Sequence, residues 1–485
     1  MFFLFFLKIA SILLAITGFT FLIPVSVALY CKEFTLLPEF IIPMIISFIL
    51  VLAINLPTKK LKYTMNTRQT FFVVAMIWII VSLMGSIPLY FSGYFGSYIN
   101  AFFESVSGFT TTGASILSNV DNLPRSINVW RCLTNWLGGM GIVTLTVALL
   151  PLLGVGGFQL IKAETTGPQK GKVTARITTT AKVLWIIYAS LTLIETIALK
   201  IAGMDFIDAL SHSFSTLGSG GFSTHTASIA SYKSPAIDVI VTIFMFMSGV
   251  NFSIYYYLII RNFREIKDNS EFKAYIGIVL FFVIAVSFSL TGTYGSFGKS
   301  LQYSGFQVIS LISTTGFTTA AFTQWPPVTQ LLLFLLYFIG GSSGSTSGGI
   351  KVIRWIILGK QLNNETKKML HPHGVFSIRL NNKVCSKDIV FNVASFMLLY
   401  FILVSVTAFA GCLGNLDIYT SVTTALSMVG NVGQSFSLSG IPLNYGLLPS
   451  FVKLFYCFAM LAGRLELYTM IIFFFPSYWK RFLTR

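Results

Sequence analysis

Four short stretches of the sequence share a pattern of small and polar residues that could bind a dehydrated cation. Each has a serine at its first position and a glycine six residues later, and together they cover 107–113, 215–221, 310–316 and 427–433. A dehydrated cation needs oxygen ligands, and backbone carbonyls supply them where the chain turns them all inward. Glycine reaches the backbone angles that this requires at little cost. The pattern therefore predicts an ion filter built from four backbone segments.

The oxygen ligands are expected at the end of each stretch, where serine and threonine add hydroxyl oxygens to the carbonyls. One alternative is that small residues only allow membrane helices to pack closely. Four stretches that align without a gap, each between two apolar spans, favour the filter. The expected filter residues are Thr110, Thr111, Thr112, Gly113, Gly218, Ser219, Gly220, Gly221, Ser313, Thr314, Thr315, Gly316, Gly430, Asn431, Val432 and Gly433.

The elements that must position these stretches are membrane helices. Of 485 residues, 54% are hydrophobic and 10% are charged, and the mean hydropathy is +0.78. Soluble globular chains carry about 25% charged residues, so this composition is typical of a chain solvated by lipid. The long apolar runs are nearly continuous and do not alternate, which favours helices over the strands of a barrel. The fold class is therefore predicted to be an all-α polytopic membrane protein.

The apolar runs follow a repeated order. An N-terminal pair of transmembrane helices comes first, and four blocks follow. Each block has an apolar span, a short stretch too brief to cross the membrane and a second apolar span. The order predicts four pseudo-repeated span–pore-helix–span units around a central pore. The pair covers 1–57, and the pore repeats cover 70–159, 181–260, 274–359 and 389–478.

The charge of +17 is explained by membrane orientation. Most of the 33 Lys and Arg residues lie in the loops between blocks and in the C-terminal tail, and loops rich in Lys and Arg remain in the cytoplasm. The filter stretches then lie on the outer side, and no nucleic-acid partner is expected. The basic stretches are 59–68, 162–182, 261–273, 351–387 and 480–485.

A run of ten Gly, Ser and Thr residues interrupts the second span of the third block. Such a run forms a poor helix. Only nine apolar residues, 331–339, precede it, so we expect it within the membrane, where irregular backbone is tolerated if it is buried in protein or lines water. The alternative is a cytoplasmic linker. The run consists of Gly340, Gly341, Ser342, Ser343, Gly344, Ser345, Thr346, Ser347, Gly348 and Gly349.

Arg464 lies in the last apolar block, with Glu466 two residues away. A charge inside the membrane is costly and usually faces a pore or a partner. Residues two apart do not share a helix face, so Arg464 and Glu466 are expected to have different partners. A structural ion pair is the alternative reading of Arg464.

At these residues the chain resembles the Trk/Ktr/HKT superfamily of potassium transporters, and within it the TrkH type. The resemblance covers essentially the whole chain and is carried by 105–114, 215–224, 313–317, 430–433 and 463–466. It implies potassium uptake across the bacterial cytoplasmic (inner) membrane through a gated, channel-like pore. It also implies a homodimer with a pore in each protomer, regulated by a cytosolic nucleotide-binding ring of the TrkA type.

The resemblance also implies roles for single residues. The run 340–349 is expected to be the gate beneath the filter, with Arg464 projecting toward the permeation path and holding the loop. Glycine at all four filter positions goes with potassium preference. Two departures bear on selectivity: Gly218 stands where a larger polar residue is common, and Gln434 with Ser435 replaces a common Pro-Gly.

Two questions about function remain open at this point. One alternative is a sodium-permeable or sodium/proton-coupled cation transporter of the same superfamily, and channel is not separated from ion-coupled symport. No catalytic constellation or phosphate-binding loop is evident, so we expect no enzyme activity and no organic cofactor. Potassium is the expected transported ion.

Overall fold

The protein is described here by a computed structural model. Within the residues it describes, the regular secondary structure is helical except for two short antiparallel strands, β1 (Arg379–Leu380) and β2 (Lys383–Val384). Six described helices are long and apolar enough to cross a membrane, and a seventh if one bent pair counts as a single span. The predicted all-α polytopic membrane fold is confirmed. The described residues are 1–58, 61, 63, 65–141, 177–374, 376–381, 383–384, 387–436 and 444–480.

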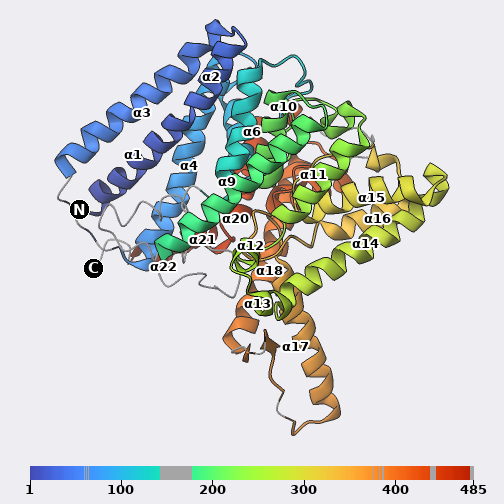
Figure 1. Ribbon diagram of the computed structural model, residues 1–485. Coiled ribbons are helices and arrows are strands. Elements are labelled where there is room, and N and C mark those ends of the chain that lie inside the picture. The colour runs from blue at the N-terminus through green and yellow to red at the C-terminus, as the bar shows by residue number, and fades with distance from the viewer. Residues whose placement is uncertain are drawn as a thin grey trace.

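The N-terminal helices form a pair at one edge of the molecule (Figure 1). α1 and α3 pack so closely that a side chain at Gly18 would overlap Ser47. The Lys8 ammonium, buried in α1, donates to the carbonyl oxygen of Thr58 at 2.9 Å, which caps the end of α3. These elements are α1 (Phe2–Thr20), α2 (Leu22–Tyr30), η1 (Phe34–Leu36) and α3 (Leu37–Thr58).

Four long helices begin the four predicted blocks. All have apolar side chains that remain exposed on one side, as expected of helices that face lipid. α4 starts with a capping box, in which the Asn66 side chain accepts from the Gln69 amide and the Gln69 side chain accepts from the Asn66 amide. The long helices are α4 (Thr67–Phe91), α9 (Ile177–Ile201), α14 (Ser270–Tyr294) and α18 (Lys387–Leu413).

Each long helix is followed by a short one that is buried at its C-terminal end. These helices have 12 to 16 residues, or about 18 to 24 Å at 1.5 Å per residue, and cannot cross a hydrocarbon layer of about 30 Å. Each packs closely against its own long helix. The short helices are α5 (Tyr98–Phe109), α10 (Phe206–Gly218), α15 (Phe297–Ile312) and α19 (Ile418–Gly430).

The third helix of each block is where the structure differs from the sequence prediction, which took the second spans as continuous apart from the run 340–349. α11 is followed by a bend of 95° into α12 (Phe252–Ile259). α20 is followed by two residues with positive φ, Glu466 and Leu467. Polar residues stand at both breaks, Asn251 at the first and Arg464 with Glu466 at the second, but the apolar runs on either side of them read as one span. The third helices are α6 (Arg125–Gly139), α11 (Pro235–Ser248), α16 (Pro327–Leu336) and α20 (Ser450–Arg464).

One long polar helix, α17 (Val352–Leu370), projects with the β-hairpin from one end of the molecule (Figure 1). The block boundaries themselves stay a prediction, and residues 142–159 of the first block lie outside the described residues. The remaining elements are η3 (Ser228–Tyr232), α13 (Phe263–Lys267), η4 (Phe322–Gln324), η5 (Tyr445–Leu447), α21 (Tyr468–Ile471), η6 (Ile472–Phe474) and α22 (Pro476–Lys480).

Candidate functional site

The four predicted filter stretches, here called ring segments 1 to 4 in chain order, have the same backbone conformation. In each, the N–H of the residue before the glycine donates to the carbonyl of the leading serine, which closes the end of the short helix. The distances are 2.8 Å for Thr112 to Ser107, 2.9 Å for Gly220 to Ser215, 2.9 Å for Thr315 to Ser310 and 2.9 Å for Val432 to Ser427.

Left-handed residues recur at two positions of each segment. The residue two before each glycine has a φ of 54° or 55°, and each glycine has a φ between 71° and 83°. The residue between them is not left-handed. Alternation of hand turns successive N–H groups to one side of the chain and successive carbonyls to the other. The left-handed residues are Thr111, Gly113, Ser219, Gly221, Thr314, Gly316, Asn431 and Gly433.

The four glycines close a ring. A Cβ atom added to any of them would overlap a carbonyl oxygen of the next segment, and the order of contacts runs from segment 1 to 2, 2 to 3, 3 to 4 and 4 back to 1. Only glycine permits both this approach and the positive φ. The contacts are Gly113 with Gly220, Gly221 with Thr315, Gly316 with Val432 and Gly433 with Thr112.

Side chains of the ring segments bind one another and the loop 340–349. The hydroxyls of Ser313 and Thr315 lie 2.8 Å apart, as do those of Thr110 and Thr112 at the equivalent positions of segment 1. The Asn431 amide donates to the Thr112 hydroxyl at 2.9 Å, which joins segments 4 and 1. All sixteen predicted filter residues therefore lie at one ring; their role as ion ligands stays a prediction.

The loop 340–349 is tied to that ring from one side. The Ser219 hydroxyl lies 2.8 Å from the Thr346 hydroxyl, and the Gly348 amide donates to the Thr314 hydroxyl at 2.7 Å. A side chain at Gly348 would overlap the carbonyl oxygen of Gly430. The loop thus contacts segments 2, 3 and 4, and most of its residues are buried.

The loop also occupies the break between α11 and α12. The Ser342 amide donates to the Gly249 carbonyl at 2.9 Å, and the Phe252 amide donates to the Gly344 carbonyl at 3.1 Å. The buried Glu271 carboxylate accepts from the Ser343 amide at 2.7 Å. Irregular backbone inside the protein is stable because these partners satisfy its hydrogen bonds.

Arg464 connects the loop to the first block. Its guanidinium donates to the carbonyls of Thr346 at 2.8 Å and Gly139 at 2.9 Å. Glu466 instead forms an ion pair with Arg354. The prediction that Arg464 and Glu466 have different partners is confirmed, whereas gating by Arg464 and the loop stays a prediction.

The whole chain can be compared with known proteins. A family model, TrkH, described as cation transport protein, matches residues 36–293 and 278–481. The chain belongs to the TrkH family. It is 38% identical over 429 residues to the Trk system potassium uptake protein TrkH of Escherichia coli K12, covering 87% of this chain and 88% of that protein. It is 36% identical over 482 residues to the protein of the same name from Halomonas elongata, covering 98% and 99%.

Among solved structures, the chain is similar to the crystal structure of the potassium transporter TrkH from Vibrio parahaemolyticus. The TM-score is 0.86 with 32% sequence identity, and the match covers 99% of this chain and 100% of that one. The family is one of transporters and not of enzymes. With bacterial relatives and six apolar helices, this TrkH-family chain is a multi-pass protein of the bacterial inner membrane.

Sequence reasoning missed two cations beneath the loop of this TrkH-family chain. Lys351 and Arg354 were counted with the basic stretch 351–387, but their exposed fractions are only 1% and 6%. The Lys351 ammonium donates to the Ser347 carbonyl, and the Arg354 guanidinium lies 3.5 Å from the centre of the Phe396 ring. Counting both as loop residues was wrong, because α17 begins inside the protein before it projects.

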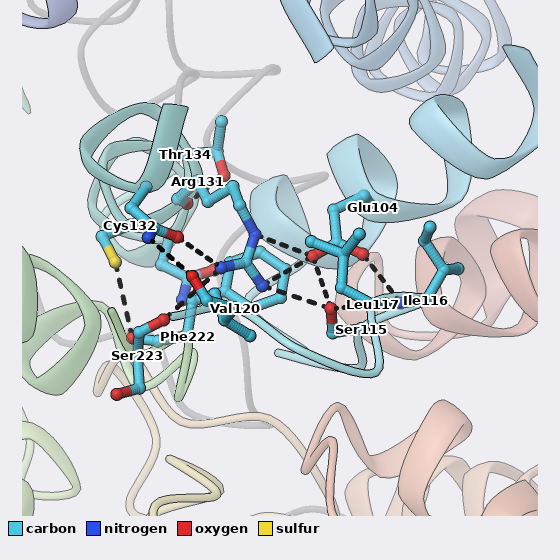
Figure 2. Close-up of polar contacts among 12 residues, drawn as sticks. Glu104, Ser115, Ile116, Leu117, Val120, Arg131, Cys132, Thr134, Phe222 and Ser223 are labelled. Atoms are coloured by element: carbon cyan, nitrogen blue, oxygen red, sulfur yellow. Dashed lines mark hydrogen bonds and ion pairs between the residues drawn. The ribbon is translucent and has the colours of Figure 1, made fainter. Parts of the chain in front are cut away.

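Sequence reasoning also missed Arg131, which lies buried in α6 between Glu104 and the chain at Phe222 and Ser223 that leaves segment 2 (Figure 2). Its Nε donates to Glu104 Oε1 at 2.9 Å, and its Nη2 lies 2.7 Å from the same oxygen. Its Nη1 donates to the Ser223 carbonyl at 3.4 Å, and its guanidinium lies 4.4 Å from the centre of the Phe222 ring. An arginine within a span was itself a signal of an important partner.

The Glu104 carboxylate accepts hydrogen bonds at both of its oxygens. Glu104, on α5, also accepts from the Ser115 hydroxyl at 2.8 Å and from the Ile116 amide at 2.9 Å (Figure 2). The ion pair therefore joins the short helix of segment 1, the chain that leaves segment 1 and the chain that leaves segment 2. Its hydrogen bonds offset the cost of burying both charges.

Proposed function

We propose that this chain takes up potassium through a pore whose selectivity filter is the ring of segments 1 to 4. The observation that carries the proposal is the closed order of contacts, in which each ring glycine meets a carbonyl of the next segment. Such a ring concentrates carbonyl oxygens around one axis, which is how a protein replaces the hydration shell of a potassium ion. The relatives are named potassium uptake proteins, which supports potassium as the cargo.

The electrostatics of the ring support a cation. α5, α10, α15 and α19 all end three or four residues before their ring glycine. The C-terminal end of a helix carries about half a negative charge, so four such ends around one axis favour a cation there. Glycine at all four ring positions is the pattern that, by the resemblance of the chain, goes with potassium preference, which supports potassium over sodium as the preferred ion.

Gating by the loop 340–349 is the second part of the proposal. The loop lies directly beneath the ring and is held by Arg464 and by hydroxyls of segments 2 and 3. Arg464 places positive charge there, which opposes cation passage while the loop is in position. Opening requires these contacts to break together.

A partner is the third part. We propose a homodimer with one pore in each protomer, controlled by a cytosolic nucleotide-binding ring of the TrkA type. The resemblance of the chain supports both. The positive-inside rule supports the placement of α17, with its Lys360, Lys367 and Lys368, on the cytoplasmic side where such a ring would act.

Ion flux in liposomes tests the transport proposal. With the purified chain reconstituted alone and with a compatible partner ring, potassium and rubidium should enter faster than sodium and lithium. Absence of any cation flux with intact insertion would overturn the pore. Equal flux of sodium and potassium would instead support the sodium-permeable alternative.

A change at Arg464 tests the gate. Arg464→Ala removes the bonds to Thr346 and Gly139, so we expect more potassium flux without the partner ring, with the ion order unchanged. The control is Arg125→Ala, which removes an exposed ion pair with Asp205 away from the loop. Partner-independent flux that stays at the starting level would contradict the gate assignment.

A further inference from the structure

Gln434 follows the ring glycine of segment 4 and reaches across to segment 3. Its side-chain nitrogen donates to the Gly316 carbonyl at 2.6 Å and to the Phe317 carbonyl at 2.8 Å. A carbonyl can only accept, so two carbonyl partners determine that this end of the amide is the nitrogen. Both of its N–H groups are then used on the outgoing backbone of segment 3.

The other end of the same amide is held by a second glutamine. Gln307, on α15 and 1% exposed, donates from Nε2 to Gln434 Oε1 at 2.8 Å. The Tyr337 hydroxyl donates to the backbone carbonyl of Gln434 at 3.2 Å. The side chain of Gln434 is therefore oriented from α15, and its backbone is oriented from the residue after α16.

This arrangement acts on a carbonyl of the ring itself. The Gly316 carbonyl belongs to a ring glycine, and its orientation is set by an amide from the neighbouring segment. Discrimination between potassium and sodium depends on how many carbonyls surround the ion, on their field and on how far they can move toward a smaller ion. A donated hydrogen bond both weakens the field of that carbonyl and restrains its movement.

We propose that Gln434, oriented by Gln307, is a positioning residue that sets the cation selectivity of this chain through the Gly316 and Phe317 carbonyls. The proposal rests on the proposed function of the ring as a filter. Without the amide, the Gly316 carbonyl turns more freely toward a small ion, and sodium passes more readily relative to potassium.

The test compares one substitution at three glutamines. Gln434→Met and Gln307→Met keep side-chain length and remove the hydrogen bonds. Gln330→Met is the matched control, because Gln330 also donates to two backbone carbonyls, those of Thr323 at 2.9 Å and Trp325 at 2.8 Å, outside the ring. The measurement is the ratio of potassium to sodium flux in liposomes, with total protein insertion determined for each variant.

We expect the ratio to fall severalfold in Gln434→Met, to fall less in Gln307→Met and to stay unchanged in Gln330→Met. Partial misfolding lowers both fluxes together and leaves their ratio unchanged, so the ratio separates positioning from stability. A wild-type ratio in Gln434→Met would overturn the proposal, as would an equal fall in Gln330→Met. If Gln434→Met does not insert, a wild-type ratio in Gln307→Met overturns it.

The result also distinguishes this proposal from the filter on which it rests. No cation flux through the unmodified chain would remove the filter itself. Selective flux that is the same in the unmodified chain and in Gln434→Met would leave the filter in place and remove only the role of Gln434.

Discussion

The contact between two neighbouring ring segments is here called an edge of the ring. Two of these edges are supported by different kinds of side chain. Segments 1 and 2 are joined behind the ring by the buried ion pair of Arg131 and Glu104, and segments 3 and 4 are joined at the ring by the uncharged amides of Gln434 and Gln307. The backbone conformation is the same at both edges. A ring folded from one chain can therefore keep its fourfold geometry while each edge is supported independently.

Removing one side chain has a different consequence at the ion pair than at the amides. When one partner of a buried ion pair is removed, the remaining charge stays desolvated without a counter-charge, and the folded state is destabilised. Removal of the neutral Gln434 amide leaves the Gly316 carbonyl and the Gln307 amide without a partner, and an unpaired neutral group costs less than an unpaired charge. The charged edge is thus expected to matter most for folding, and the amide edge most for selectivity.

The largest effect is expected from serine at a ring glycine. Gly113→Ser and Gly316→Ser each place a side chain against a carbonyl of the next segment, at the charged edge and the amide edge respectively. We expect the ratio of potassium to sodium flux to fall by about tenfold or more, equivalent to about 1.4 kcal/mol of discrimination. Liposome flux measures it.

The difference between Gly113→Ser and Gly316→Ser also tests whether the charged edge and the amide edge are supported independently. The overlap is smaller at Gly316 than at Gly113, and the side chains that join segments 3 and 4 at the amide edge are uncharged. Gly316→Ser is therefore expected to retain more potassium flux than Gly113→Ser. Unchanged ion ratios in both variants would contradict the filter assignment, and equal losses would remove the distinction between the edges.

The second effect is expected at the buried ion pair. Arg131→Met leaves Glu104 buried without its charge partner, and we expect unfolding to become easier by about 3 to 5 kcal/mol. Adding Glu104→Gln should recover part of this loss, because the remaining amide carries no charge. Thermal unfolding in detergent is measured for the unmodified chain, for each single variant and for the double variant, which completes a double-mutant cycle.

The matched control is an ion pair of similar length at the surface. Arg125 and Asp205 lie 2.9 Å apart with 51% and 46% of their side chains exposed, and Arg125→Met should cost no more than about 1 kcal/mol. A loss at Arg131 as small as that at Arg125 would show that the buried pair does not support the ring.

Much of the ring could be predicted from the sequence, because its signal is local. A glycine six residues after a serine, found four times, located Gly113, Gly221, Gly316 and Gly433 without any knowledge of contacts. The loop 340–349 was likewise evident, since ten consecutive small residues cannot form a stable helix.

The supports of the ring could not be predicted in the same way. Gln434 was noticed as a departure from a common pattern, but its partners Gly316 and Gln307 are more than 100 residues away along the chain. Arg131 finds its partner on a different helix. The bend after α11 is held by tertiary contacts with the loop, and the small and polar residues at 248–251 do not by themselves specify those contacts.

The smallest effect is expected at a second charged contact of the edge between segments 1 and 2. In the loop between α5 and α6, Asp121 accepts from the Thr226 amide at 3.4 Å and lies 3.0 Å from His225 Nδ1. Hydrogen bonding from Thr226 holds the pKa of Asp121 below its ordinary value, and His225 acts in the same direction. Because the native pKa is lowered, this stabilisation is complete above the ordinary aspartate pKa and is lost as the pH falls through the native pKa.

The pH dependence of thermal unfolding in Asp121→Asn therefore distinguishes the charged edge from the amide edge. We expect a small fall in the midpoint of thermal unfolding at neutral pH, and this difference from the unmodified chain should vanish in acid. Any difference caused by Gln434→Met should be independent of pH over the same range, because neither amide titrates. A deficit in Asp121→Asn that persists in acid would show that the carboxylate charge does not stabilise this edge, and a pH-dependent effect at Gln434 would show that the amide edge is coupled to a titrating group.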